Sequence, residues 1–447
     1  MKKFFQIPNK LIISVLIFSL LILLIFSSPS VQAESIQTAV DYLKTQTTNP
    51  WITMALVAAG ETDLDLNYLK TVGGNLATDY EKTILALTAA GKNPRTFGEV
   101  DFIAQLKTFY QSNQIGSDSL LNDDFWGILA LLSAGENLSD EIIQGAKNFI
   151  LINQNSDGGW GYALSEGSDT NDTAIAIMAL LEAGVNADEQ TIINAVNFLR
   201  ASQNIDGGFP YVPNSEYSES DAGSDAWVIS AIYKLGQNPY DWQKEGQNPV
   251  DHLKSLQRAD GSFKWIALED VGYPTLTADA VIALSQKSYP VKRLPLIIWA
   301  NPADITYGTA INTAQLNAIS SVEGTFVYTP GEGTILNVGP DQTLSVEFTP
   351  LDTTNYNIAT ATVNINVLKA APVVTGENLI IGTFYASSPS NATGPEDDVN
   401  GDNKIDKYDF SLMMNNWGKT GSNNCDINGD GKVDKYDFAL LMLNWTM

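Results

Sequence analysis

The chain has 447 residues and a formal net charge of −26, because 51 acidic side chains stand against 25 basic ones. This length allows several domains. The acidic excess argues against a nucleic-acid partner, since phosphate binding requires a basic face. With a single cysteine, Cys425, no internal disulfide can form, so we expect the folded domains to rely on their hydrophobic cores.

The N-terminus has the pattern of an export signal. Lysines precede an uninterrupted apolar stretch over residues 11–26, and small residues follow as far as Ala33. This pattern predicts a signal peptide over residues 1–33, cleaved after Ala33, and therefore a secreted or cell-surface protein. An uncleaved membrane anchor is the alternative, because the stretch is only slightly shorter than the roughly 20 residues that span a bilayer.

Residues 34–290 repeat one helical hairpin. In residues 146–184, an amphipathic run ends in a Gly-rich loop with Trp160, and Asp172 then begins an almost wholly apolar run. Six such apolar runs, spaced by about 30–50 residues, predict a closed ring with apolar helices inside and amphipathic ones outside. Three units share the same four residues in the same order: a side chain with a ring, then Gln, then Gly, then an aromatic residue. These are Phe149, Gln154, Gly158 and Trp160 in one unit, Phe198, Gln203, Gly207 and Phe209 in the next, and His252, Gln257, Gly261 and Phe263 in the last. In the first three units the Gly-aromatic loop is degenerate.

This pattern resembles the QW repeats of the prenyltransferase and squalene-cyclase superfamily. The resemblance covers about residues 35–290 and implies an α6/α6 toroid, a fold that hosts enzymes and binding proteins alike. Class II terpene cyclases have D-x-D-D-T-A at an inner helix start, and residues 169–174 resemble it, but Asn171 stands where the catalytic acid is expected. The zinc of protein prenyltransferases requires Asp, Cys and His, whereas the ring has only His252 and no Cys. Neither activity is therefore expected, and His252 is interpreted as a packing residue.

A polysaccharide hydrolase or lyase that uses carboxylates alone is the remaining enzymatic alternative, since such chemistry needs two carboxylates about 5–10 Å apart. Asp124 and Asp172 are the candidate pair. Each candidate can instead serve as a helix cap or dipole partner, so we expect a non-catalytic recognition domain whose ligand is a polysaccharide or another cell-surface ligand. The candidates near inner-helix starts are Asp123, Asp124, Asp169, Asp172, Asp225 and Asp279. Aromatic residues that could line a cavity, or wedge helices together, are Trp126, Trp160, Phe209, Trp227, Phe263 and Trp265.

The helical period stops near Pro290, and residues 291–370 show the alternation of half-buried strands. Their order resembles bacterial Ig-like domains, which implies an all-β sandwich, and Tyr356 resembles a tyrosine corner. We expect this domain to act as a spacer, and adhesion to a carbohydrate or a protein is the alternative. Residues 371–395 are rich in Pro, Ser, Thr, Gly and Asn, which is typical of a linker.

Residues 396–447 contain two short acidic loops, each followed by an apolar helix. Oxygen ligands at loop positions 1, 3, 5, 9 and 12, with a backbone carbonyl at position 7, are the spacing with which one loop wraps calcium. We therefore expect two Ca²⁺ sites. Their predicted ligands are Asp398, Asn400, Asp402, Lys404, Asp406 and Asp409 in the first loop, and Asp426, Asn428, Asp430, Lys432, Asp434 and Asp437 in the second.

Duplicated loop-helix units of this kind resemble type I dockerins. The resemblance implies a small α domain that docks to a cohesin-bearing partner, and the loop residues implied to face the partner are Lys407, Tyr408, Lys435 and Tyr436. Without calcium the loop carboxylates repel one another, so we expect this domain to unfold. The sequence thus predicts a toroid, an Ig-like sandwich and a dockerin in one exported chain.

Overall fold

The computed structural model describes residues 31–215, 218–370, 399–400, 404–405, 407–421 and 423–443. The chain divides into two compact units, Met1–Ala371 and Pro372–Met447, which are considered separately below. Almost all of the predicted signal peptide and the whole predicted linker lie outside the described residues. In the part that is described, no helix combines the length and apolar character needed to cross a membrane.

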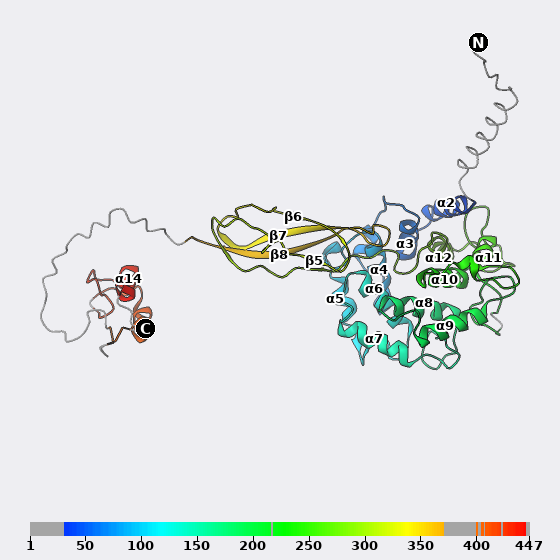
Figure 1. Ribbon diagram of the computed structural model, residues 1–447, viewed down its shortest axis with the longest axis horizontal. Helices are drawn as coiled ribbons and strands as arrows, with labels where there is room; N and C mark the ends of the chain where they lie inside the picture. The colour runs from blue at the N-terminus through cyan, green and yellow to red at the C-terminus, as the bar shows by residue number, and fades with distance from the viewer. Residues whose placement is uncertain are drawn as a thin grey trace, which may run out of the picture. The chain divides into compact units, whose positions relative to one another are not determined.

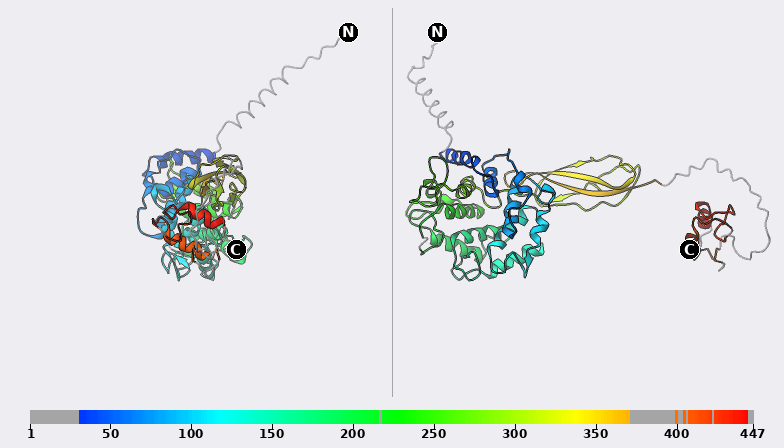
Figure 2. Two further views of the ribbon diagram at one scale, coloured as in Figure 1. Left: turned by 90° about the vertical axis from the view of Figure 1, so that its left-hand side faces the viewer. Right: turned by 180° about the vertical axis from the view of Figure 1, so that it is seen from behind.

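Six helices form a closed inner ring in the first unit (Figures 1 and 2). Each contacts the next in chain order, and the last of them contacts the first. Most of their residues are buried, which fits helices that are apolar on almost every side. The ring consists of α3 Pro50–Ala58, α4 Ala77–Ala89, α6 Asn122–Ser133, α8 Thr170–Glu182, α10 Ala222–Lys234 and α12 Pro274–Leu284. The predicted helical toroid is confirmed.

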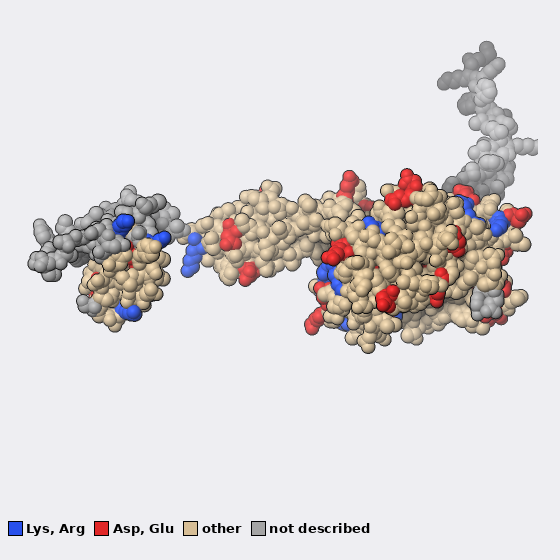
Figure 3. Space-filling view, turned by 90° about the horizontal axis from the view of Figure 1, so that it is seen from below, with Lys and Arg blue, Asp and Glu red and all other residues tan. Residues whose placement is uncertain are grey.

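An outer layer of amphipathic elements surrounds this ring, and most of them pack against an inner helix. They are α2 Val31–Lys44, η1 Asn67–Lys70, α5 Phe102–Lys107, α7 Glu141–Ile152, α9 Gln190–Ser202 and α11 Pro249–Ser255. Shorter pieces connect the units: η2 Phe97–Glu99, η3 Pro239–Asp241 and a hairpin of β1 Tyr110–Gln111 and β2 Gln114–Ile115. On the face drawn in Figure 3, acidic side chains are scattered over the toroid.

The repeated Gln residues join neighbouring units. Each donates one bond to the Gly carbonyl of its own loop and a second to a carbonyl of the next unit. The second bonds run from Gln154 to Thr191 O (2.9 Å), from Gln203 to Trp242 O (2.9 Å) and from Gln257 to Ser35 O (2.8 Å). The last repeat therefore binds α2, the first helix, and closes the ring. α2 begins at Val31, just before the predicted cleavage position.

The β-rich region follows the ring. One pair joins β3 Ile297–Ile298 to β5 Ile319–Ser320, and a four-stranded sheet has the order β4-β8-β7-β6. β4 pairs parallel to β8, and the other neighbours are antiparallel. The strands of this sheet are β4 Ile305–Thr306, β6 Gly324–Thr329, β7 Gly339–Pro350 and β8 Ala359–Leu368. The predicted alternation is confirmed, because Leu344, Val346, Phe348, Val363, Ile365 and Val367 are all buried.

The second unit has a small core between two helices, α13 Lys407–Asn416 and α14 Lys435–Leu443, which contact each other. Six apolar side chains are buried there: Val399, Ile405, Met413, Cys425, Val433 and Leu441. Cys425 is thus a core residue with a free thiol.

Candidate functional site

The starts of the inner helices gather carboxylates at one rim of the ring. Asp169 caps α8, since its Oδ1 accepts the N–H of Asp172 at 2.7 Å. Asp221 caps α10 in the same way, accepting from Ser224 N at 2.9 Å. Such caps satisfy backbone donors that have no partner within the helix. Asp169 and Asp221 therefore both act as helix caps, the structural role that was considered for acids at inner-helix starts.

A second position, one turn into the inner helix, accepts the backbone N–H of the preceding loop residue. This contact recurs in four units: Thr173 Oγ1 from Trp160 N (3.0 Å), Asp225 Oδ1 from Phe209 N (2.7 Å), Thr277 Oγ1 from Phe263 N (2.9 Å) and Asp124 Oδ1 from Ile115 N (2.8 Å). Ile115 thus takes the place of the loop aromatic in the degenerate third unit. Because threonine suffices in two units, the second carboxylate oxygen of Asp124 and Asp225 is available for another contact.

For Asp124 that second oxygen has no partner. Its Oδ2 is buried without a hydrogen bond among the described residues, and so are both carboxylate oxygens of Glu81 on α4. Burial, together with the neighbouring Asp123 charge, raises the pKa of Asp124 to about 8. Burial and the charges of Asp123 and Asp124 hold the pKa of Glu81 well above its usual range. The carboxyl groups of Glu81 and Asp124 therefore lie near each other, and both hold a proton at neutral pH.

Glu81 was not singled out by sequence reasoning. It stands inside the inner helix α4, away from the helix start and from any motif. The one available signal was a Glu within an otherwise apolar inner-helix run. Gly127 on α6 leaves space for Ile115 and Glu81, because a Cβ there would lie 2.5 Å from Ile115 Cδ1 and 3.3 Å from Glu81 Oε1.

Asp172 has a different partner from Asp124. Its side chain is hydrogen bonded to that of Asp169, and both carboxyls are almost wholly buried. Burial raises the pKa of both groups, further for Asp169 because the Asp172 charge adds to it. Burial, and after it the charge of Asp172 among nearby acids, raises the phenol pKa values of Tyr162 and Tyr211 as well. The structure therefore brings Asp172 to Asp169 and Asp124 to Glu81, which does not favour Asp124 and Asp172 as a joint catalytic pair.

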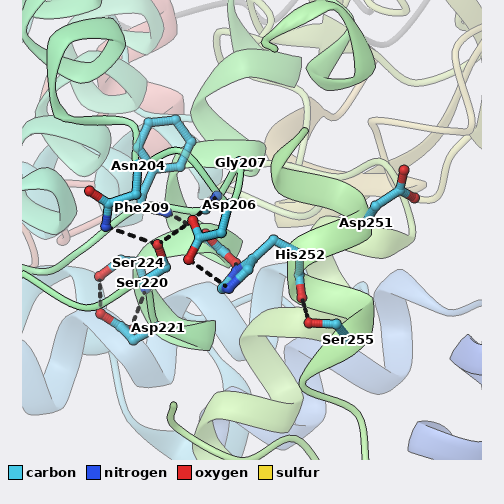
Figure 4. A network of polar contacts seen from close by, with 12 residues as sticks. Asn204, Asp206, Gly207, Phe209, Ser220, Asp221, Ser224, Asp251, His252 and Ser255 are labelled. Carbon is cyan, nitrogen blue, oxygen red and sulfur yellow. Dashed lines mark hydrogen bonds and ion pairs between the residues drawn. The ribbon is translucent and has the colours of Figure 1, made fainter. Parts of the chain in front are cut away.

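His252 on α11 contacts two carboxylates, Asp225 and Asp206. Figure 4 shows the His252 ring beside Asp206. Its Nδ1 lies 2.6 Å from the buried Asp225 Oδ2, and its Nε2 lies 3.5 Å from Asp206 Oδ2. Burial alone would lower the pKa of His252, but the two carboxylates outweigh it and raise that pKa. Burial raises the pKa of Asp225 to about 6 even though His252 opposes the shift. The interpretation of His252 as a packing residue thus needs correction, since it supplies the partner for the second oxygen of Asp225.

Aromatic rings fill the centre of the toroid. Trp126 on α6 contacts Trp51 on α3 at 5.1 Å and Trp227 on α10 at 5.8 Å between ring centroids. These three helices are not neighbours in the ring, so their side chains meet across its middle. Tyr289, which follows α12, completes the cluster at 5.2 Å from Trp126 and donates its hydroxyl to Asp279 Oδ1 at 2.8 Å. Burial raises the pKa of Asp279 to about 7.

The rings that wedge between helices are Trp160, Phe209 and Phe263, each without exposed surface. The aromatic residues of the repeat therefore act as packing, and Trp126 and Trp227 occupy the space that a central cavity would need.

The opposite end of the ring, where the inner helices end, is covered by the β-rich region. Leu294 N donates to Ser133 O of α6 at 2.7 Å, and Asn357 Nδ2 donates to Thr88 O of α4 at 2.7 Å. Arg293 forms an ion pair with Glu182 at the end of α8. These contacts satisfy carbonyls that have no partner within their helices. The β-rich region therefore packs on the end of the ring that lies opposite the helix starts.

In the second unit, the last residue of each acidic loop organises the loop. Asp437 Oδ1 accepts from Asn428 N at 3.0 Å, and Asp409 Oδ1 accepts from Asn400 N at 3.1 Å. Both carboxylates are buried. Asp437 Oδ2 also accepts from the backbone N–H of Asp434 at 2.8 Å. The two halves of the repeat thus share one contact between loop positions 3 and 12.

The second loop suits a hard cation. Asp426 Oδ1 is buried without a hydrogen bond in the described residues, while its Oδ2 accepts from Gly431 N at 2.8 Å. An unsatisfied carboxylate oxygen at loop position 1 is a free ligand in a donor set made of oxygen alone, which is what calcium prefers. No three acidic, His or Cys side chains of the described residues are gathered into a metal cluster. Of the first loop, Asp398, Asp402 and Asp406 lie outside the described residues.

The residues implied to face the partner are at the start of both helices. Tyr408 and Tyr436 are 61% and 59% exposed. The Lys407 ammonium lies 5.1 Å from the Tyr408 ring centroid, and that of Lys435 lies 4.9 Å from Tyr436. The two helices therefore present the same exposed pair of a cation and an aromatic ring.

Comparisons with known proteins agree with both units. Residues 41–246 match the prenyltransferase alpha-alpha toroid domain, and residues 396–444 match the dockerin type I domain. No curated protein matches the chain at the significance level applied. Among solved structures, the type II terpene cyclase MstE from Scytonema is 15% identical over 57% of this chain and 97% of that chain, with a TM-score of 0.43.

Two further similar structures are more distant by TM-score. The ent-copalyl diphosphate synthase from Streptomyces platensis is 17% identical over 55% of this chain and 50% of that chain, with a TM-score of 0.38. The protein geranylgeranyltransferase-I of Candida albicans is 15% identical over 60% of this chain and 90% of that chain, also with a TM-score of 0.38. Nothing about activity follows from likeness at this level. The family matches establish that the chain carries a prenyltransferase-type α/α toroid domain and a type I dockerin domain.

Proposed function

We propose that this is an exported protein that docks through its dockerin, in a calcium-dependent way, to a cohesin-bearing partner. The observation that carries the proposal is the buried, unpartnered Asp426 Oδ1 in a loop whose Asp437 contact is repeated at Asp409. Lys407, Tyr408, Lys435 and Tyr436 form the partner-facing surface. Because both halves present the same pair, either half can engage the cohesin.

Calcium, when bound, neutralises the loop carboxylates and holds each loop closed. In the second loop, the proposed ligands are Asp426, Asn428, Asp430, the Lys432 carbonyl, Asp434 and Asp437. Asp398, Asn400, Asp402, the Lys404 carbonyl, Asp406 and Asp409 take the same places in the first. Asp409 and Asp437 also receive backbone N–H bonds, so they position the loop as well as bind the ion.

We further propose that the toroid is a recognition domain without catalytic activity, whose ligand is a polysaccharide or another cell-surface ligand. Three features support this: Asn171 replaces the acid of the cyclase motif, the ring lacks a zinc ligand set, and aromatic residues fill its centre. A dockerin-tethered polysaccharide hydrolase is not favoured, because Asp124 and Asp172 each have a separate carboxyl neighbour.

The proposed organisation assigns residues 1–33 to a signal peptide, 34–290 to the toroid, 291–370 to an Ig-like sandwich, 371–395 to a linker and 396–447 to the dockerin. The Ig-like domain acts as a spacer that is fixed to the toroid. Arg293 and Asn357 support the fixed arrangement, because both bond across the junction.

One experiment tests the role of the toroid. The full chain is applied to a panel of plant and microbial polysaccharides, with gel retardation and the release of reducing-end or unsaturated products measured together. The proposal predicts retardation without products. Product release that is abolished by Asp169→Asn or Asp124→Asn would make the toroid an enzyme and overturn the proposal.

A further inference from the structure

A groove of about 550 Å³ lies where α3 and α4 end, against the loop between β7 and β8. Three lysines line it: Lys92, Lys287 and Lys292. They come from different segments, the turn after α4 and the segment after α12. In a chain with 25 basic and 51 acidic residues, three ammonium groups around one groove form a local exception.

Two carboxylates, Glu61 and Asp63, also line the groove, and Glu61 is paired with Lys44 rather than with any of the three lysines. Lys287 Nζ donates to Thr354 O at 3.1 Å, and Lys292 Nζ donates to Thr353 O at 3.1 Å. Within the described residues, neither they nor Lys92 forms an ion pair. Several other basic residues of the toroid do pair with carboxylates: Lys44, Lys82, Arg95, Lys107, Lys234, Arg258 and Arg293.

Two of these lysines, Lys287 and Lys292, repel each other. Burial and the charge of Lys292 lower the pKa of Lys287, and the charge of Asp352 acts against them. The free carbonyls at the end of α4 do not need these ammonium groups, because Asn357 Nδ2 already donates to Thr88 O and Ala89 O. An anion placed between the lysines would relieve the repulsion and gain attraction in a partly dry site.

The other residues that line the groove include no aromatic ring. Six of them are apolar: Val57, Ala58, Leu64, Leu66, Ala89 and Ala90. An inorganic ion has no apolar atoms that could pack against these side chains, whereas an organic anion has a carbon framework that could. Lysine also accepts carboxylates in many orientations, since its ammonium is a compact point charge. The volume is in the range of small-ligand sites, which often lie between domains.

We propose that this groove binds a compact organic anion with two or more carboxylates, either free or as the uronic-acid residues of a polysaccharide. The proposal rests on the recognition role given to the toroid and adds to it a ligand class and a place. Lys92 meets the anion from the α4 side, and Lys287 and Lys292 meet it from the side of the β-rich region. Both domains are then needed for binding.

The test uses the full chain in calorimetric titrations at low ionic strength with trigalacturonate, citrate and the neutral trisaccharide maltotriose. We expect trigalacturonate or citrate to bind, maltotriose not to bind, and affinity to fall as salt is added. Binding of trigalacturonate would identify the ligand as the uronic-acid residues of a polysaccharide. Binding of citrate alone would identify it as a free organic anion. Failure of both anions, or equal binding of maltotriose, would overturn the proposal.

Lys92→Gln is the decisive variant, because Lys92 is exposed and makes no hydrogen bond with the fold in the described residues. It should weaken anion binding about 3- to 10-fold, as expected for loss of a partly exposed charge contact. The matched control is Lys70→Gln, the same change at an exposed lysine outside the groove. Undiminished binding by Lys92→Gln would contradict the proposal.

The outcomes separate this inference from the proposed function. Anion binding should persist in a calcium chelator, whereas docking to a cohesin should not. Binding of a neutral polysaccharide without binding of either anion would support the recognition role of the toroid but contradict the anion site in the groove. Anion binding accompanied by product release would support the anion site but contradict the proposal that the toroid is non-catalytic.

Discussion

The hydroxyl of Tyr289 donates a 2.8 Å hydrogen bond to Asp279, although Tyr289 follows the end of the last inner helix. The chain therefore returns into the ring before it enters the β-rich region. Trp126 packs against the Tyr289 ring at 5.2 Å between centroids, so one residue both fills the centre and satisfies a buried carboxyl.

Replacing Tyr289 by Phe tests this relationship. The change leaves the ring in place and removes the donor to Asp279, which should cost about 1–3 kcal/mol of unfolding free energy. The cost should be larger above pH 7 than below it, because the lost bond stabilises the ionised form of Asp279, whose pKa is about 7. Thermal melts at pH 5.5 and pH 8.5 measure it. The control, Tyr307→Phe at a half-exposed tyrosine, should leave both melts unchanged.

The toroid should lose stability as pH rises. The pKa of Asp124 is raised from 3.8 to about 8 and that of Asp279 to about 7, so the folded state holds protons that the unfolded state has released. Stability is then fullest near pH 4 and declines as pH rises toward and through these folded pKa values. The melting temperature of the toroid transition, followed in calcium from pH 5 to pH 9, should fall. A constant or rising value would contradict the assignment.

The Asp124→Asn variant tests whether ionisation of Asp124 causes this loss of stability, because it removes the charge and keeps the hydrogen bond. The amide oxygen can still accept from Ile115 N, but no charge forms next to Glu81. The variant should therefore be more stable than the parent chain at pH 8.5, and by a smaller margin at pH 5. A variant that is less stable at both values would mean that the Asp124 carboxylate has a favourable partner.

The contact between His252 and Asp225 can be tested by replacing both residues with those found at the same positions of another repeat unit. His252→Phe leaves the buried Asp225 carboxylate without its partner and should cost about 3–5 kcal/mol. In the preceding unit, the corresponding residues are Phe198 and Thr173, so His252→Phe combined with Asp225→Thr should restore most of the loss. Urea unfolding of the two variants measures the coupling. If the double variant is as unstable as the single one, the two residues do not act as a pair.

Ring closure can be tested at Gln257. Gln257→Ala removes the bonds to Ser35 O and Gly261 O, which should cost about 1–2 kcal/mol and make α2 more accessible to proteases. Limited proteolysis with N-terminal sequencing of the products measures the second effect. Gln190→Ala, at an exposed glutamine of α9, is the control and should not change the cleavage pattern.

Much of this fold could be predicted because each unit repeats one local pattern. The Gln, Gly and aromatic residues mark the loops, and an Asp such as Asp169 marks a helix start where a cap is required. The alternation around Leu344 and Val363 predicts strands for the same local reason. The spacing of acidic residues likewise indicated a loop, in which Asp426 accepts from Gly431 N and Asp437 accepts from Asn428 N.

The rest depends on contacts between segments far apart in the chain. Glu81 has no motif, and its burial depends on the space left by Gly127 on the neighbouring helix. The Asp225–His252 contact joins two successive units, so the His252 pattern by itself indicated only packing. Tyr289 lies at the predicted end of the ring, where nothing local indicates that the side chain turns back into its centre.

The most direct test of the account measures binding of a recombinant type I cohesin to the full chain by calorimetry, first in calcium and then in excess chelator. We predict tight binding in calcium, none in chelator, and a lower calcium affinity in Asp426→Ala, with Asp341→Ala in the β-rich region as the unaffected control. Docking that persists in chelator, or no docking to any type I cohesin in calcium, would contradict the central claim.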